Sequence, residues 1–379
     1  MINWIAQGNR VMETKFWEVK KNLETAIAEA AGLIAAGEVV AFPTETVYGL
    51  GADGLNADAV AKIFAAKGRP ADNPLILHIA DTEQIYPLTS GLNANARALI
   101  DTFWPGPLTI VVPRSERVPD IVTAGLDTVA VRMPSHPVAA ALIRAAGCPI
   151  AAPSANVSGK PSPTNAQDVA DDMTGKVAGI LDGGSCGIGV ESTVVDTTSP
   201  VPTILRPGGI TREMLEERLG AVEIDPALNG DPALRPKAPG MKYRHYAPKA
   251  PMYLYEGTQA AQRLAEAVLR AQKQGMHIGV LCDDAVKGRL EESLRRGHTA
   301  EIFSWGQGKA DLAEHLYELL RDFDRVSPEL IVGMGVDEKG LGLAVMNRLR
   351  KAAGYLILQA DEDGITVKSG SGFPEFLFS

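Results

Sequence analysis

The sequence predicts two α/β domains joined by a proline-rich segment, and three observations support this fold class. The chain has 379 residues, a length that suits two domains better than one. Short β-rich runs alternate with helical stretches on both sides of residues 229–251. That segment, NGDPALRPKAPGMKYRHYAPKAP, holds five prolines and two glycines, so it is neither a helix nor a central strand.

The first domain is expected over residues 21–228, as a mixed α/β sheet with long irregular loops. Residues 1–20 are expected to be an N-terminal extension without the apolar region of a secretory signal. The run from Met12 reads like a natural start, so residues 1–11 are either an upstream extension or a loosely held tail. Hydrophobic alternation predicts strands at 39–42, 75–79, 108–112, 129–133, 179–181, 193–196 and 203–205. Helical periodicity predicts helices at 21–36, 57–67, 93–103, 137–146 and 212–219.

The second domain, residues 252–379, has a more regular pattern. Strands are expected at 252–255, 278–281, 301–304 and 330–332, and helices at 259–274, 285–295, 310–323 and 343–353. This alternation predicts a smaller, Rossmann-like three-layer domain with a parallel sheet. Because it has no concentrated polar cluster, a structural or lid-anchoring role is favoured over a second active site, and Asn347 and Arg348 are among its most prominent polar residues.

Composition excludes several classes of protein. Hydrophobic residues make up 45% of the chain and charged residues 22%, as in a globular protein with a core. A net charge of −9 argues against a general electrostatic grip on nucleic acid. No window approaches the ~20 apolar residues of a membrane helix. The three cysteines form no CxxC pair and the six histidines no metal-ligand spacing, so we expect a cytoplasmic protein without structural metal.

Two short motifs match known patterns but lack the required context. Residues 49–54 fit G-x-G-x-x-G, yet Pro43 and a polar run separate them from the preceding strand, so a loop with closely approached glycines is expected instead of a dinucleotide site. Residues 183–187 fit G-x-S-x-G, but a second strand follows where a hydrolase needs a helix. The chain has no Walker A motif, so any nucleoside triphosphate is bound without a P-loop.

Cations and small hydroxyl residues gather at the ends of predicted elements in the first domain. Lys67, Arg69, Arg132 and Arg206 lie beside Gly or Pro turns, where arginine forks and a lysine charge suit phosphate or carboxylate. Ser154, Ser158, Ser192 and Thr193 add neutral donors next to glycines. Each residue alone is more often an ordinary surface cation or turn serine. Together they indicate a site for an anionic small molecule, and the residues alone lead no further.

Longer motifs in this domain carry a family resemblance. FPTETVYGLGA, KGRPADNPLILHI, FWPGPLTIVV, VAVRMPSHP, APSANVSGKPSPT, ESTVVD and ILRPGGIT follow one another over residues 37–211. They resemble the YrdC-like domain of threonylcarbamoyl-AMP synthases, which implies a twisted mixed sheet with helices. GMKYRHYAPKAP followed by an α/β domain resembles the two-domain form of that family. The resemblance covers nearly the whole chain from Thr14.

The resemblance implies an adenylyl transfer from ATP, with Mg²⁺, that joins L-threonine and bicarbonate or CO2 into threonylcarbamoyl-AMP and pyrophosphate. A separate transferase complex would then modify tRNA, and direct tRNA contact by this chain stays open. Lys67 and Arg69 would be catalytic. The ATP-binding residues implied are Lys67, Arg69, Asn73, Thr128, Ser154, Ser162, Arg206 and Tyr246. The threonine-binding residues implied are Thr46, His78, Arg132, Ala152 and Ser192, with Ala152 acting only through its backbone.

The proline-rich segment, residues 229–251, is compatible with more than one function. Its basic residues outnumber the one acidic residue by four, which suits either a solvated linker or a lid over an anionic, water-sensitive intermediate. Its tyrosines and basic residues also fit an RNA-binding module without catalysis, against which the net charge stands. A carbamoyltransferase accessory domain of the kind found in hydrogenase maturation proteins would need CxxC pairs and length that this chain lacks.

Overall fold

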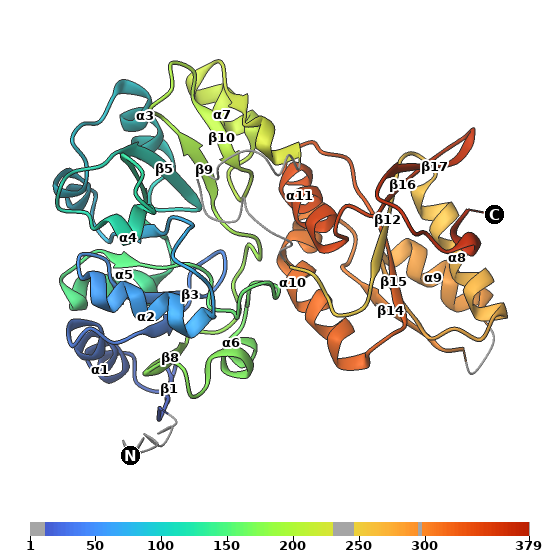
Figure 1. The fold of residues 1–379 in the computed structure, drawn as a ribbon, viewed down its shortest axis with the longest axis horizontal. Coiled ribbons are helices and arrows are strands. Elements are labelled where there is room, and N and C mark those ends of the chain that lie inside the picture. The colour runs from blue at the N-terminus through green and yellow to red at the C-terminus, as the bar shows by residue number, and fades with distance from the viewer. Residues whose placement is uncertain (1–11, 230–245, 295–297, 379) are drawn as a thin grey trace, which may run out of the picture.

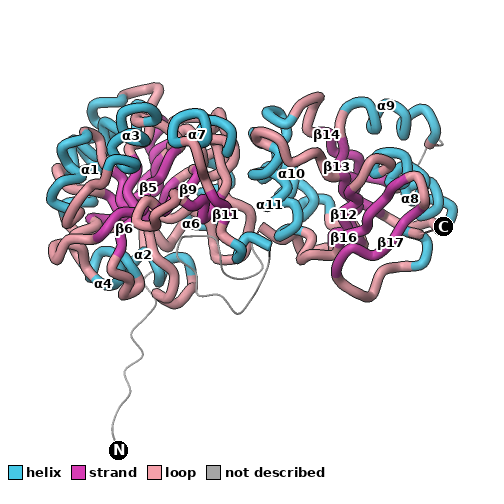
Figure 2. Tube along the Cα trace, turned by 90° about the horizontal axis from the view of Figure 1, so that it is seen from above, coloured by secondary structure: helices cyan, strands magenta, loops and turns pink. Residues whose placement is uncertain are grey.

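The computed structural model describes residues 12–229, 246–294 and 298–378. Figure 1 shows two α/β units side by side, with helices α10 (Lys309–Val326) and α11 (Gly342–Ala352) of the second unit facing the first. Seen from above, the same two helices lie between the first unit and the second sheet (Figure 2). Within the described part of the chain, no helix combines the length and apolar character needed to cross a membrane.

The first unit is built on one long mixed sheet. Its strand order is β1-β8-β2-β3-β7-β4-β6-β5-β9-β10-β11. The strands are β1 (Lys15–Glu18), β2 (Val40–Phe42), β3 (Gly49–Asp53), β4 (Ile76–His78), β5 (Leu108–Pro113), β6 (Thr128–Arg132), β7 (Ile150–Ala151), β8 (Gly179–Asp182), β9 (Thr193–Asp196), β10 (Thr203–Arg206) and β11 (Glu223–Ile224). Strands β4 and β6 are parallel, so His78 and Arg132 are neighbours at their carboxyl ends. This edge positions the site.

Helices and short turns cover the sheet. They are α1 (Leu23–Ala35), α2 (Ala57–Lys67), η1 (Thr82–Leu88), α3 (Ala94–Phe103), α4 (Asp120–Thr123), α5 (Pro137–Ala146), α6 (Ala166–Met173), α7 (Arg212–Leu219) and η2 (Pro226–Asn229). Asn56 caps α2 by accepting from two backbone amides, and Gly68 ends it with φ 66°. A left-handed residue after the last turn favours glycine, so the Lys67-Gly68 pair fixes where the helix stops.

The second unit is a three-layer α/β domain, as predicted. Its sheet order is β14-β13-β15-β12-β16-β17, with all strands parallel except the last. The elements are β12 (Met252–Glu256), α8 (Ala260–Lys273), β13 (Ile278–Cys282), α9 (Asp284–Ser293), β14 (Ala300–Ser304), α10, β15 (Leu330–Met334), α11, β16 (Ile357–Asp361), β17 (Gly364–Ser369) and η3 (Glu375–Leu377). Helices α8 and α9 lie on the opposite face of the sheet from α10 and α11 (Figure 1).

The two units share a packed interface. Val47 and Val190 of the first unit belong to the same buried apolar cluster as the second unit's core. At Gly189, φ is 77° and an added Cβ would lie 2.2 Å from the carbonyl oxygen of Ala313 in α10. Arg321 of α10 donates to Asp172 of α6 at 3.0 Å. The interface is therefore both apolar and charged, with backbones in close contact.

The structure corrects two expectations. Residues 49–53 form strand β3, not a loop, and pair antiparallel with β2. Their glycines are still closely approached, because an added Cβ at Gly51 would lie 2.7 Å from the Phe42 ring. The extension expected over residues 1–20 ends earlier, since β1 pairs in parallel with β8. Residues 1–11 and most of the 229–251 segment lie outside the described residues, so the lid stays a prediction.

Candidate active site

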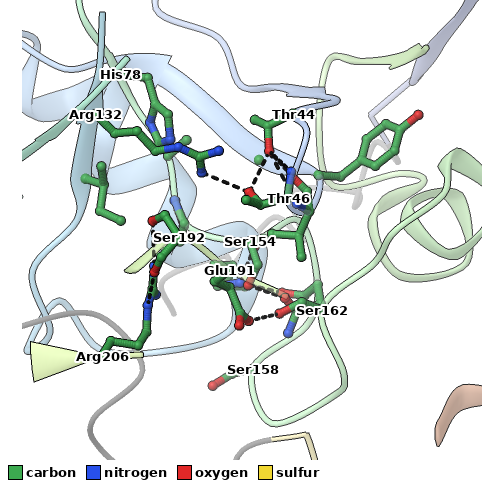
Figure 3. A pocket seen from close by; sticks show the side chains of 18 of the residues that line it. Thr44, Thr46, His78, Arg132, Ser154, Ser158, Ser162, Glu191, Ser192 and Arg206 are labelled. Carbon is green, nitrogen blue, oxygen red and sulfur yellow. Dashed lines mark hydrogen bonds between the residues drawn. The ribbon is translucent and has the colours of Figure 1, made fainter. Parts of the chain in front are cut away.

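A pocket opens in the first domain beside the carboxyl ends of β4 and β6, close to the interface with the second domain. Its empty volume is about 730 Å³, including the part open to solvent. Lys67, Arg69, Arg132 and Arg206 supply its positive charge, and Glu191 is the carboxylate in its lining. Figure 3 shows the hydroxyl and cationic side chains converging from separate segments of the chain.

Lys67, the last residue of α2, ties the helix to the serine-rich loop that follows β7. Its ammonium group donates to the carbonyl oxygens of Ser154 at 2.5 Å and Asn156 at 2.7 Å. Burial, assisted by the nearby charge of Arg69, lowers the pKa of Lys67 well below its usual value. An approaching anion would raise that pKa again, because an opposite charge favours the ammonium form. Lys67 therefore combines a structural contact with a charge suited to an anionic ligand.

Arg69 lies two residues beyond the end of α2, and two of its nitrogens remain available to a ligand. Its guanidinium carbon lies 5.3 Å from the centre of the Phe64 ring, which fixes its plane by a cation–π contact. Nε and Nη2 are buried and make no hydrogen bond within the described residues. Buried donors are rarely left without a partner, so this guanidinium fits an anion that enters the pocket.

The loop over residues 153–162 is anchored to strand β3 on one side of the pocket. Gly49 and Ser154 form a β-bridge, and the amide of Ala155 donates to the carbonyl oxygen of Tyr48 at 2.8 Å. The Ser154 hydroxyl donates to Asn156 Oδ1 at 2.5 Å. The loop is thereby held by backbone bonds, which place its serines along the pocket wall (Figure 3).

Arg132 is the centre of the opposite wall. It donates from Nη1 to the Thr46 hydroxyl at 2.9 Å and from Nε to the carbonyl oxygen of Gly106 at 3.3 Å. Its Nη2 lies 2.8 Å from Glu45 Oε1, an ion pair between two largely buried groups. Burial alone would raise the pKa of Glu45, but Arg132 holds it below its usual value. Arg132 is therefore held by three partners, and it adds positive charge to this wall of the pocket.

His78 stands beside Arg132 as a neutral ring. Burial and the charge of Arg132 lower its pKa to about 3. Its Nδ1 is buried and has no hydrogen-bond partner in the described part of the chain. A neutral imidazole nitrogen can donate to or accept from a small polar ligand without adding charge.

Ser192 and Arg206 form a further part of the pocket lining. The Ser192 hydroxyl lies 2.7 Å from that of Thr109, and Arg206 donates to the Ser192 hydroxyl and carbonyl oxygen, each at 3.0 Å. Strands β5 and β9 are parallel and place these two hydroxyls next to each other. Arg206 is therefore oriented by the backbone of the segment that carries Ser192.

Glu191 links the pocket to the second domain. It accepts from the Ser162 hydroxyl at 2.7 Å, from the Tyr317 hydroxyl at 2.7 Å and from two nitrogens of Arg348 at 3.1 and 3.0 Å. Burial opposes its ionisation, but Arg348 and Arg206 lower its pKa to about 2. Tyr246 also reaches the pocket, with its ring stacked on Tyr317 at 5.0 Å.

Most of the residues implied by the sequence resemblance come together. Those in the pocket lining are Thr46, Lys67, Arg69, His78, Arg132, Ala152, Ser154, Ser162, Ser192, Arg206 and Tyr246. Two are not in the lining. Thr128 begins strand β6, whose other end carries Arg132. Asn73 lies in the loop before β4, buried, with its Oδ1 unpartnered among the described residues.

Sequence reasoning missed the side chains that support this lining. Glu45 carries no signal beyond its place beside Thr46. Glu191 is the first residue of ESTVVD, yet nothing in that motif assigns it a role. Tyr317 lies on an ordinary amphipathic helix, and Arg348 stands out in the sequence only as a polar residue, although its side chain is fully buried against Glu191. Contacts between two domains leave no periodic mark in either sequence segment.

Among the described residues, the lining of the pocket does not form a metal site of its own. No group of three or more His, Cys, Asp or Glu side chains suited to a metal occurs in the described ranges. Glu45 and Glu191 are both paired with arginines. A divalent cation would therefore take its ligands mainly from phosphate oxygens of a bound molecule.

Comparisons with known proteins decide the family. A profile described as "Telomere recombination", for the Sua5, YciO and YrdC group, matches residues 32–208, and "Threonylcarbamoyl-AMP synthase, C-terminal domain" matches residues 210–354. The threonylcarbamoyl-AMP synthase of Pyrococcus abyssi is 50% identical over 338 residues, covering 89% of this chain and 96% of the relative. That of Bacillus subtilis is 48% identical, covering 92% and 100%. The chain belongs to the threonylcarbamoyl-AMP synthase family.

A solved structure agrees with this assignment. The Sua5 protein of Pyrococcus abyssi, described in complex with L-threonine, is 48% identical and superposes with a TM-score of 0.83. The match covers 92% of this chain and 99% of that one. Both domains and their arrangement therefore match those of this relative, and the fold class predicted from the sequence is confirmed.

Proposed function

We propose that this chain is a threonylcarbamoyl-AMP synthase that uses ATP, L-threonine and bicarbonate or CO2. The observation that carries the proposal is one pocket with two chemically distinct walls. Lys67 and Arg69 provide cationic donors on one side, and Arg132, Thr46 and His78 provide a carboxylate and hydroxyl site on the other. The family assignment supports the catalytic reading over an RNA-binding module.

On the ATP side, the unpartnered donors of Arg69 and the buried charge of Lys67 would hold the phosphates. Charge develops on the phosphoryl oxygens and on the leaving pyrophosphate, and fixed cations stabilise it. Arg206 would contribute from the far end. Mg²⁺ would enter with ATP and share that charge, its ligands supplied by phosphate. Asn73 and Thr128 are proposed only as contacts to parts of ATP that extend beyond the pocket lining.

On the threonine side, the positive charge of Arg132 suits the amino-acid carboxylate, since guanidinium and carboxylate groups pair strongly. Thr46 and Ser192 are placed to read the threonine hydroxyl, with His78 beside them. A site built to bond a hydroxyl strongly rejects an analogue without it. Ala152 lies in the lining and can contribute only its backbone.

The chemistry follows from bringing these walls together. The threonine amine and CO2 form a carbamate with loss of a proton. A carbamate oxygen then attacks the α-phosphorus of ATP, the bond from that phosphorus to the bridging oxygen breaks, and pyrophosphate leaves with the electron pair. Positioning supplies most of the acceleration, because a carbamate needs no further general base. The proline-rich segment is proposed to cover this water-sensitive product and Tyr246 to close over the nucleotide.

The test is pyrophosphate release from ATP by the purified protein with Mg²⁺ and bicarbonate. We expect release only when L-threonine is present, and a sharp fall with serine or valine in its place. Arg69→Met is expected to abolish most of the activity without unfolding the protein, since Nε and Nη2 of Arg69 have no hydrogen-bond partner within the described residues. Release that ignores threonine, from folded protein, would contradict the proposal. Cytosolic action and transfer of the product to a tRNA-modifying complex extend the same proposal.

A further inference from the structure

Glu191 is the acceptor in each of its hydrogen bonds to Ser162, Tyr317 and Arg348. Its Oε1 accepts from Ser162, and its Oε2 accepts from Tyr317 and Arg348. An ionised carboxylate has no hydrogen to give, so each of these partners must be the donor. Burial is opposed here by Arg348 and Arg206, which keep the pKa of Glu191 at about 2, so the group is ionised throughout the neutral range.

This direction settles what Ser162 can offer to a ligand. A serine hydroxyl has one hydrogen and two lone pairs. The hydrogen is committed to Glu191, and Ser162 lies in the pocket lining while being almost fully buried. Toward the pocket it can therefore only accept a hydrogen bond.

The second domain holds this arrangement in place. Arg348 lies on α11 with a fully buried side chain, and its Nη1 donates to the carbonyl oxygen of Pro207. Tyr317 lies on the neighbouring helix α10, and its ring stacks on that of Tyr246. Glu191 is thus clamped between two helices of the second domain and one hydroxyl of the first.

We propose that Glu191, clamped by Arg348 and Tyr317, is a positioning residue that fixes Ser162 as a hydrogen-bond acceptor for a donor group of the nucleotide. The inference rests on the proposed ATP-binding function. Phosphate oxygens only accept, so an acceptor-only Ser162 cannot bind them. The donors of ATP are its two ribose hydroxyls and its adenine amine. Ser162 is therefore assigned to one of these three donors of the nucleoside part of ATP, and the KM for threonine tests whether threonine supplies the donor instead.

The substitution Glu191→Gln reverses the direction of the hydrogen bond between residue 191 and Ser162. Arg348 and Tyr317 are donors, so they select the amide oxygen of the new side chain for the Oε2 position. The amide nitrogen then faces Ser162 and donates to it, which frees the serine hydrogen for the pocket. The same atoms occupy the same space, but Ser162 changes from acceptor to donor.

The experiment measures kcat/KM for ATP, 2′-deoxy-ATP, 3′-deoxy-ATP and purine riboside triphosphate, each with saturating threonine and bicarbonate. The wild type is expected to use one of the three analogues about tenfold less well than ATP, the loss typical of one hydrogen bond. That analogue identifies the donor. The discrimination ratio is kcat/KM for ATP divided by kcat/KM for that analogue. In Glu191→Gln and in Ser162→Ala, this ratio is expected to fall to about twofold or less, while the KM for threonine stays within about twofold of the wild-type value.

Two further variants separate positioning from folding. Arg325→Gln removes an interface ion pair with Asp168, away from the pocket, and should keep the wild-type ratio. Arg348→Lys keeps a donor to Glu191 and should retain most of the ratio, whereas Arg348→Met should lose it. Equal use of all analogues by the wild type, or an unchanged ratio in both Glu191→Gln and Ser162→Ala, would overturn the inference. Absence of threonine-dependent turnover in the wild type would instead overturn the proposed function.

Discussion

Replacing Arg132 by Met separates its structural role from its role toward threonine. The Arg132 side chain is 4% exposed and that of Glu45 is 14% exposed, so the pair is largely desolvated. Removing the guanidinium leaves a buried carboxylate without its charge partner. Such a loss costs about 3–5 kcal/mol, and the partial exposure of Glu45 favours the lower figure. Thermal unfolding should show a midpoint lowered by roughly 6–12 °C, at about 2–4 °C per kcal/mol.

The double variant Glu45→Gln/Arg132→Met decides between the two roles. With both charges gone, we expect most of the lost stability to return, to within about 1 kcal/mol of the wild type. In Arg132→Met and in the double variant alike, the KM for threonine should be about 100-fold above the wild-type value, because the charged contact to the substrate carboxylate is missing. The KM for ATP should change by less than about threefold.

Glu45→Gln alone is the matched control. It leaves Arg132 bonded to Thr46 and removes a carboxylate that competes with the substrate, so threonine binding should persist or tighten. The reasoning would be refuted by a double variant that recovers both its stability and its wild-type KM for threonine. That result would make Arg132 a structural partner of Glu45 with no part in binding the amino acid.

Three further predictions follow from single contacts. Gly189→Ala should destabilise the protein by at least about 2 kcal/mol in thermal unfolding, because its φ is 77° and its Cβ would meet Ala313 at 2.2 Å, whereas Gly187→Ala, with nothing within 4 Å, should be neutral. His78 has a pKa lowered to about 3, so unfolding takes up a proton below about pH 6.5 and stability falls as pH falls. His78→Asn should remove up to about 2 kcal/mol of the decline between pH 6.5 and 5 in denaturant titrations, and an unchanged slope would count against a buried neutral ring. Burial and Arg69 lower the pKa of Lys67, so ATP binding at alkaline pH should take up protons, seen by calorimetry as heats that differ between two buffers. Lys67→Arg, which stays charged, should abolish that difference.

The regular elements are predictable because each carries its own periodic signal. Helix α2 is expected at 57–67 and is found there, since Asn56 caps it and Gly68 ends it. Strand β3 escapes prediction because its glycines mimic a loop, whereas in the structure the strand pairs with β2 and β7 and its glycines lie against the Phe42 ring. The terminal hairpin β16–β17 also escapes it, as it follows the last helix without the alternation that marks the earlier strands.

The candidate site is predictable where one segment carries a complete chemical message. Lys67 and Arg69 at a helix end, taken together with serines such as Ser154, indicate a site for an anionic small molecule, and the individual roles come from the family resemblance. Their supporting partners are different. Whether Glu45 neutralises Arg132, or whether His78 is neutral, depends on burial and on distances between strands far apart in sequence. Such properties belong to the folded arrangement and to no single segment.

The second domain contributes more to the pocket than its sequence indicates. A buried ion pair such as Glu191–Arg348 adds little net stability, because desolvating both charges offsets most of their attraction. Two apolar side chains would pack the same interface at least as well. The pair instead keeps Glu191 ionised, so that Ser162 must donate its hydrogen to the carboxylate. On our proposal, the second domain thus determines how the first domain binds its substrate.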